Sequence, residues 1–141
     1  MPNDKGHGTI NLLALAVSIL ILIRYTALGS VELVILAIAY MFGTFFLSPD
    51  MDINSTSYKR WGYLRIFWWP YKVFFRHRGY SHHIILGPFS RLANLALIVV
   101  PVMFFAGTYP PVEHMILFAG GVWGANTVHV VADGVQTRVL I

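Results

Sequence analysis

The sequence predicts an all-α fold, an integral membrane bundle of about four transmembrane helices with short interfacial helices between the second and the third. Three observations predict it: 57% of the 141 residues are hydrophobic, only 11% are charged, and the hydrophobic residues gather in long runs. A soluble domain carries about 25% charged residues, so much of this surface is expected to face lipid. The length fits a single domain that covers residues 1–141.

Four apolar runs are candidate transmembrane helices. The first would extend about 28 Å at about 1.5 Å per residue, close to the thickness of a bilayer's hydrocarbon core. A cleaved signal peptide is the alternative for this run, although the run is long for one. Glycine, serine and proline separate the runs, as expected at turns. The expected spans are residues 10–28, 31–48, 88–107 and 112–133.

The segment of residues 58–78, between the second and third runs, interleaves aromatic and basic side chains. This combination is typical of helices that lie in the headgroup region of a membrane. Nucleic-acid binding is the alternative, but the position between two apolar runs favours the interface, and no nucleic-acid partner is expected. Arg65, Lys72 and Arg76 fall on one helical face, and Pro70 is expected to split the segment into two short helices.

The distribution of basic residues predicts how the chain crosses the membrane. Most of its Lys and Arg residues lie between the second and third runs, which places that loop in the cytoplasm by the positive-inside rule. Four spans then place both termini in the cytoplasm, as in a multi-pass protein of the cytoplasmic membrane. His114 falls on the opposite side. The same topology brings the following ionisable residues to the cytoplasmic face: His7, Asp50, Asp52, His82, His129 and Asp133.

These residues are candidate metal ligands. His129 and Asp133 are four residues apart, so they share one face of a helix with the small residues Gly121 and Ala125. Asp133 lies near a helix C-terminus, where the dipole disfavours a carboxylate, so a metal or an arginine such as Arg138 or Arg91 is expected to compensate it. The chain has no cysteine, which leaves histidine and carboxylate ligands, suited to zinc, manganese or iron.

Each candidate also has an ordinary structural interpretation. Asp50 and Asp52 follow Pro49 in what reads as a turn, and Ser55 and Trp61 exclude a calcium-binding loop by occupying its required glycine and glutamate positions. A lone interfacial histidine is usually a hydrogen-bonded structural residue, and we keep that interpretation for His77 and His83. The convergence at one membrane face favours function for the others, because ionisable groups at membrane depth are costly.

Four motifs carry a resemblance to a known family. They are LSPDMD at 47–52, YKRWG at 58–62, RGYSH at 78–82 and HVVAD at 129–133. In this order they resemble a family of small prokaryotic membrane proteins that bind metal, and are similar to the YdjM-like membrane-bound metal-dependent hydrolases. That group is distantly similar to the helical zinc phospholipases C and P1-type nucleases. The resemblance covers nearly the whole chain from His7 onward.

The resemblance implies a site with one or two divalent ions, most readily zinc, with manganese or iron as alternatives. One ion would be held by Asp50 or Asp52 together with His82, His129 and Asp133, and a second would share Asp133 with His7. Such a site would activate water to hydrolyse a phosphoester in a lipid or lipid-linked substrate, with the remaining aspartate of the 50/52 pair accepting a proton. The substrate phosphate would contact Arg91, Arg78 and Arg60. For Arg91, snorkelling or pairing with an aspartate is the alternative.

Two other functions remain open. In the first, the chain is a non-catalytic metal-binding membrane scaffold or partner-binding protein, in which the bound ion holds helix ends together. Metal transport is the weaker alternative, because the middle of the second and fourth spans holds no ionisable residue. Membrane lipid is an expected partner, and the face of Gly120 and Gly124 is a candidate surface for oligomerisation.

Overall fold

The computed structural model describes residues 4–74 and 80–139, with side chains described for 6–74 and 81–134. Every regular element in these ranges is helical, which confirms the all-α prediction. The elements are α1 (Asp4–Tyr25), α2 (Ser30–Phe45), η1 (Pro49–Asp52), α3 (Thr56–Arg60), η2 (Gly62–Trp68), α4 (Trp69–Phe74), η3 (Tyr80–His82), α5 (Leu86–Ala106) and α6 (Val112–Val139).

Three helices are long and apolar enough to cross a membrane, judged by length and composition. They comprise Gly6–Tyr25 in α1, Leu86–Ala106 in α5 and Val112–Gly134 in α6. The fourth expected span corresponds to α2, which has 16 residues. It extends about 24 Å, less than the roughly 30 Å of a hydrocarbon core. The membrane character is therefore consistent with three helices, and a bundle of four spans stays a prediction.

The closest helix packing is that of α2 against α6. A Cβ atom at Gly43 would lie 2.9 Å from the Cα atom of Val122, and one at Gly121 would lie 2.7 Å from the carbonyl oxygen of Leu36. Only glycine permits backbones to approach so closely. The small residues Gly121 and Ala125 therefore pack inside this chain, as expected for that face. The pairing also places the middle of α6, at Val122 and Ala125, beside the C-terminal end of α2.

The Gly120 and Gly124 face has a different environment. A Cβ atom at Gly120 would meet nothing within 4 Å, whereas one at Gly124 would lie 3.4 Å from the Tyr40 ring of the same chain. Oligomerisation through this face stays a prediction.

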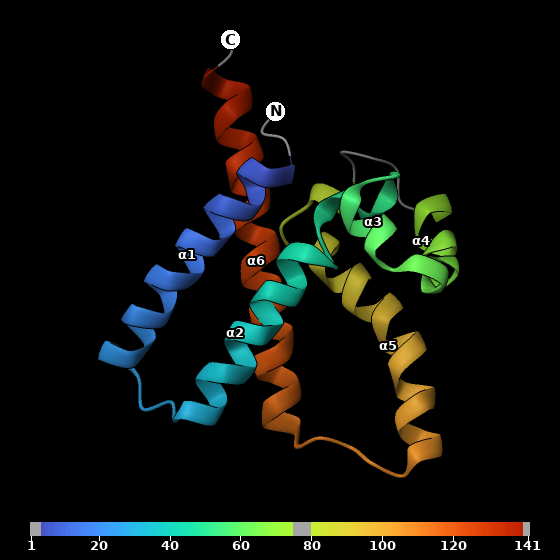
Figure 1. Cartoon of the computed structure of the whole chain (residues 1–141), viewed down its shortest axis with the longest axis horizontal. Helices are drawn as coiled ribbons and strands as arrows, with labels where there is room; N and C mark the ends of the chain where they lie inside the picture. The colour runs from blue at the N-terminus through green and yellow to red at the C-terminus, as the bar shows by residue number, and fades with distance from the viewer. Residues whose placement is uncertain (1–3, 75–79, 140–141) are drawn as a thin grey trace.

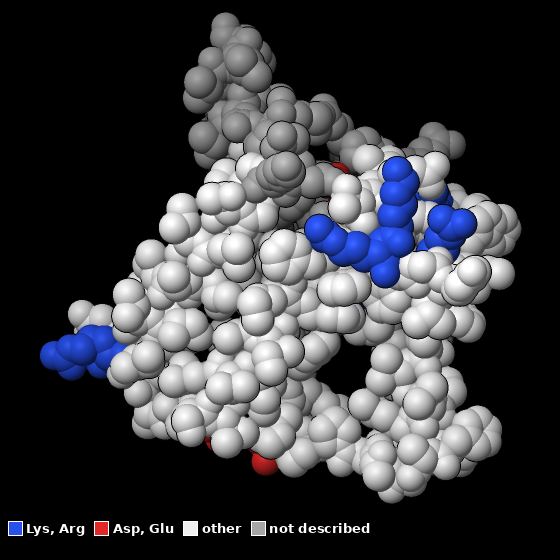
Figure 2. Space-filling model, viewed as in Figure 1, with Lys and Arg blue, Asp and Glu red and all other residues white. Residues whose placement is uncertain are grey.

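The expected interfacial segment forms the short elements α3, η2 and α4, which cover the end of α2. Pro70 lies in the first turn of α4, directly after η2. The Trp61 indole donates a hydrogen bond to the carbonyl oxygen of Phe46 at 2.9 Å, and Trp68, at the end of η2, is completely buried. Outer aromatic rings such as that of Tyr63, 99% exposed, face away from the protein. Figure 2 shows basic side chains gathered over these short helices.

The start of α1, the end of α2, the short helices and the C-terminal half of α6 lie at one end of the molecule (Figure 1). From this end α5 runs away from α6, and Figure 2 shows an opening between its lower part and the rest of the chain. Gly107 ends α5 in the left-handed conformation with φ 64°, where its N–H bonds back to the last turn. Segments distant in sequence thus converge where the ionisable residues were expected.

Candidate metal centre

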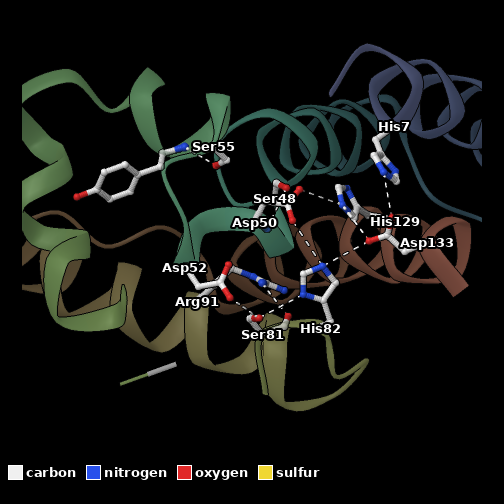
Figure 3. Close-up of polar contacts among 11 residues, drawn as sticks. His7, Ser48, Asp50, Asp52, Ser55, Ser81, His82, Arg91, His129 and Asp133 are labelled. Carbon is white, nitrogen blue, oxygen red and sulfur yellow. Dashed lines mark hydrogen bonds and ion pairs between the residues drawn. The ribbon is translucent and has the colours of Figure 1, made fainter. Parts of the chain in front are cut away.

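Five ionisable side chains meet at this end of the molecule (Figure 3): His7 on α1, Asp50 in η1, His82 in η3, and His129 and Asp133 on α6. His7 Nε2 lies 3.1 Å from Asp133 Oδ1. His82 Nε2 lies 3.5 Å from Asp50 Oδ1 and 3.4 Å from Asp133 Oδ2. His129 Nε2 lies 3.5 Å from Asp50 Oδ2 and 3.8 Å from Asp133 Oδ2. All three imidazoles therefore direct Nε2 at a carboxylate.

These atoms form two overlapping sets of candidate ligands. One set is His7, His129 and Asp133, the other is Asp50, His82 and His129, and within each set the ligand atoms lie within 4.8 Å of one another. Ligand atoms about 2.1 Å from a central ion in a tetrahedral site are about 3.4 Å apart. The observed separations of 3.1 to 3.8 Å between imidazole nitrogens and carboxylate oxygens fit such a site.

The cluster is largely removed from water. Side-chain exposure is 6% for His129 and rises only to 18% for Asp50. The Nε2 atom of His129 is buried and makes no hydrogen bond of good geometry, although two carboxylates are near it. The His7 and His129 rings stack with centroids 4.1 Å apart. Because buried donors and charges are costly unless compensated, this arrangement fits a bound cation.

The turn after α2 explains why Asp50 faces the cluster. Pro49 opens η1, and the Ser48 hydroxyl accepts a hydrogen bond from the Asp50 backbone N–H at 3.3 Å. Leu47 and Met51 on either side are fully buried and anchor the turn in the core. Burial by itself would raise the pKa of Asp50, but the nearby imidazoles of His129 and His82 outweigh it and hold this pKa well below its usual range. Asp50 is therefore a carboxylate.

Asp52 has a different environment from Asp50. Its Oδ2 atom accepts a hydrogen bond from the Ser81 hydroxyl at 2.8 Å, and it belongs to neither ligand set. The Arg91 side chain is completely buried, and its Nη1 donates to the carbonyl oxygen of Ser81 at 3.0 Å. Figure 3 shows Asp52, Ser81 and Arg91 together beside His82, on the side away from Asp133.

The other arginines and histidines considered from the sequence belong to neither ligand set. The exposed guanidinium of Arg60 donates to the carbonyl oxygen of Phe45 at 2.9 Å. Arg78 and His77 lie outside the described residues. His83 Nδ1 accepts hydrogen bonds from the backbone N–H groups of Ile85 and Leu86, at 3.1 and 3.2 Å, next to the start of α5.

A small cavity lies beside the cluster. Its volume is about 20 Å³, and its lining includes His7, His129, Ser48 and Arg60. A cavity of roughly 10–15 Å³ is enough for one water molecule with polar partners. The site thus has room for a water next to two candidate ligands.

Sequence reasoning did not single out Ser81, Asn11 or Gly87 as contributors to this region. Asn11 lies one turn after His7 on α1, is 1% exposed and accepts a hydrogen bond from the Tyr40 hydroxyl at 3.1 Å. A Cβ atom at Gly87 would collide with the carbonyl oxygen of Ser81. Two features of the sequence pointed to these residues. Asn11 is a polar residue in an apolar run, four positions after His7, and Ser81 directly precedes His82.

Comparison with known proteins agrees with the chemistry of this cluster. The family model described as "Uncharacterized metal-binding protein (DUF2227)" matches residues 2–119. The chain belongs to this family. The metal-binding part of the expected resemblance is thereby confirmed, whereas the relation to YdjM-like hydrolases stays a prediction. The matched residues include His7, Asp50 and His82, and they end before His129 and Asp133.

A protein of Aquifex aeolicus (strain VF5), described as "Uncharacterized protein", is 48% identical to this chain over 59 residues. The alignment covers 41% of this chain and 42% of that protein, so the chain spans less than half the length of this relative. No solved structure matches the chain.

Proposed function

We propose that the chain is a membrane-embedded, metal-dependent hydrolase of phosphoester bonds in a lipid or lipid-linked substrate. The observation that carries the proposal is the pair of overlapping His/Asp ligand sets with a water-sized cavity beside them. A divalent ion held there would supply Lewis acidity and activate water at neutral pH. The concentration of Lys and Arg residues between the second and third apolar runs supports a cytoplasmic location of the site.

The ligand geometry supports roles for individual residues. His82, His129 and Asp50 would hold one ion, most readily zinc, with Asp133 Oδ2 as a fourth ligand. The other oxygen of Asp133 faces His7, so this carboxylate is placed to bridge to a second ion. Manganese and iron accept the same donors.

Phosphate recognition is best supported at Arg60. Its guanidinium is exposed and lines the cavity together with His7 and His129. Guanidinium groups match the geometry of phosphate oxygens. Arg91 is completely buried and bonded to Ser81, which supports a structural part for it.

A second cavity supports a lipid substrate. It has a volume of about 520 Å³ and lies between α4 and α5, with Phe74, Phe89 and Leu97 among its apolar lining residues. Ser90 and Asn94 add polar groups to its wall. Pockets of roughly 300–1,000 Å³ are typical of small-molecule sites. The exposed apolar surface of α5 and the basic short helices suit an acyl chain with an anionic headgroup.

The test is metal analysis followed by assays of the full chain purified in detergent. We expect at least one equivalent of transition metal, and turnover of aryl phosphates or of phospholipid vesicles. Asp133→Asn and His82→Ala should abolish this turnover. His114→Ala is the matched control, because this histidine lies at the opposite end of α6 and should leave turnover unchanged. Metal retained without turnover of any substrate would contradict the hydrolase proposal.

One observation favours the scaffold as a second candidate. The ligands come from α1, η1, η3 and α6, so a bound ion would tie together segments that are distant in the sequence. In that case the metal would raise stability without any turnover.

A further inference from the structure

Ser81 lies at the edge of the metal centre, between Asp52 and His82 (Figure 3). It is fully buried. Its hydroxyl donates to Asp52 Oδ2 at 2.8 Å, and its oxygen lies 3.2 Å from His82 Nδ1. The opposite ring nitrogen of His82, Nε2, faces Asp50 and Asp133. A single hydroxyl thus connects the imidazole to a carboxylate outside the ligand cluster.

The number of hydroxyl protons decides the direction of these bonds. A serine hydroxyl has one proton, and here Asp52 receives it. Towards His82 the hydroxyl can only accept, so the hydrogen bond requires the proton on Nδ1. In a neutral imidazole the lone pair is then on Nε2, the atom directed at Asp50 and Asp133. This is the tautomer and orientation that a metal ligand needs.

Two residues of α5 hold Ser81 in place. Arg91 Nη1 donates to the carbonyl oxygen of Ser81 at 3.0 Å, and the guanidinium lies close to Asp52 in the same buried region (Figure 3). Gly87 allows the same carbonyl to approach α5, because any Cβ atom there would collide with it. The serine is therefore fixed through its backbone as well as its hydroxyl.

We propose that Asp52 and Ser81 are positioning residues of the metal centre, which hold His82 with Nε2 directed at the ion. Asp50 supplies the carboxylate ligand, and Asp52 acts on the ion only through Ser81 and His82. The proposal rests on metal binding by the cluster and is independent of the proposed hydrolysis.

The test is titration of the full chain in detergent with Co²⁺, followed in the visible absorption bands. Ser81→Ala and Asp52→Asn should each weaken Co²⁺ binding about 10- to 100-fold, the usual effect of losing a partner of a ligating histidine. The positions of the bands should stay unchanged, because the ligands remain. Asp50→Asn should instead shift the bands, because a ligand is replaced.

A second measurement reports on the hydrogen bond itself. In the Co²⁺-loaded protein the Nδ1 proton of His82 should give a shifted NMR signal that exchanges slowly with water. It should exchange rapidly in Ser81→Ala, where its acceptor is missing. Ser90→Ala is the matched control, because that hydroxyl donates to the Gly87 carbonyl oxygen at 2.8 Å and does not bond His82. Both readouts should be unchanged in this control.

Several outcomes would overturn the proposal. If Asp52→Asn shifts the absorption bands as Asp50→Asn does, Asp52 is a ligand. If Ser81→Ala binds Co²⁺ with unchanged affinity, the Ser81 hydroxyl does not position His82. If Ser81→Ala loses its helical circular dichroism, the variant is unfolded. The Co²⁺ affinity and the absorption bands of Asp52→Asn then decide the proposal alone. Absence of Co²⁺ binding by the unaltered chain would overturn the proposal together with the metal centre. Binding without hydrolysis would contradict only the proposed reaction.

Discussion

At the scale of single residues, the two carboxylates of the 50/52 pair are distinguished by their partners. Asp50 lies between two imidazoles, whereas Asp52 is bonded to a buried hydroxyl. Asp133 contacts two histidines, because its Oδ1 atom lies near His7 and its Oδ2 atom lies near His82. Two positions apart in a tight turn, the side chains point in different directions, so residues of identical chemistry acquire different roles.

A second ion at Asp133 can be tested at His7. This histidine contacts the cluster through Asp133 Oδ1 and shares no carboxylate oxygen with His82. We expect His7→Ala to lose about one of two bound equivalents of metal and to retain the ion held by Asp50, His82 and His129. Elemental analysis of the purified protein checks this. Equal metal content in the variant and the unaltered chain would contradict a second ion that uses His7.

At the scale of helices, the contact of α2 with α6 sets where His129 lies relative to Asp50. The contact depends on the glycines that let the two backbones approach. The neighbouring glycines of α6 provide a matched pair of substitutions, because Gly121 is buried against α2 and Gly120 faces open space.

We expect Gly121→Ala to destabilise the protein by about 1–3 kcal/mol, because its Cβ atom would overlap the backbone of α2 and force the helices apart. Gly120→Ala should be neutral or stabilising by up to about 1 kcal/mol, since alanine favours the helix more than glycine. Thermal unfolding in detergent compares the two variants. An equal effect of both would show that close packing of α2 and α6 does not limit stability.

At the scale of the whole molecule, the metal centre joins the start of α1, the turn after α2, the segment before α5 and the end of α6. An ion that binds only the folded chain stabilises it by mass action. The helices α1, α5 and α6 expose much apolar surface and are long enough to cross a membrane. The helix α2, with 16 residues, is shorter than a membrane span.

Removal of metal should therefore lower the stability of the unaltered chain. At a free metal concentration about 100 times the dissociation constant, the expected loss on chelation is about 2.7 kcal/mol. Thermal unfolding with and without chelator measures this, and added Zn²⁺ should restore the original midpoint. His129→Ala, which removes the histidine common to both ligand sets, should unfold at the same temperature with or without chelator. A chelator effect of equal size in this variant would place the stabilising ion elsewhere.

The predicted orientation can be tested by cysteine labelling, because the chain has no cysteine of its own. Thr56, in α3, and Thr108, after α5, are both exposed and lie at opposite ends of the molecule. A membrane-impermeant maleimide should label Thr108→Cys in intact cells and should label Thr56→Cys only after the membrane is opened. The unaltered chain is the blank. Labelling of Thr56→Cys in intact cells would reverse the topology.

The sequence by itself determined the all-α fold and the helices that begin near Ser30, Leu86 and Val112, because long apolar runs and their breaks act locally. The first helix was expected from residue 10, whereas α1 begins at Asp4 and includes the polar residues before the apolar run. It also determined that His129 and Asp133 share one helix face, since their spacing is a property of any helix. Only the tertiary structure decided that Asp50 faces the imidazoles while Asp52 faces Ser81, and that Arg91 is buried. The direction of a side chain in a turn depends on contacts with segments far along the chain, which no local pattern encodes.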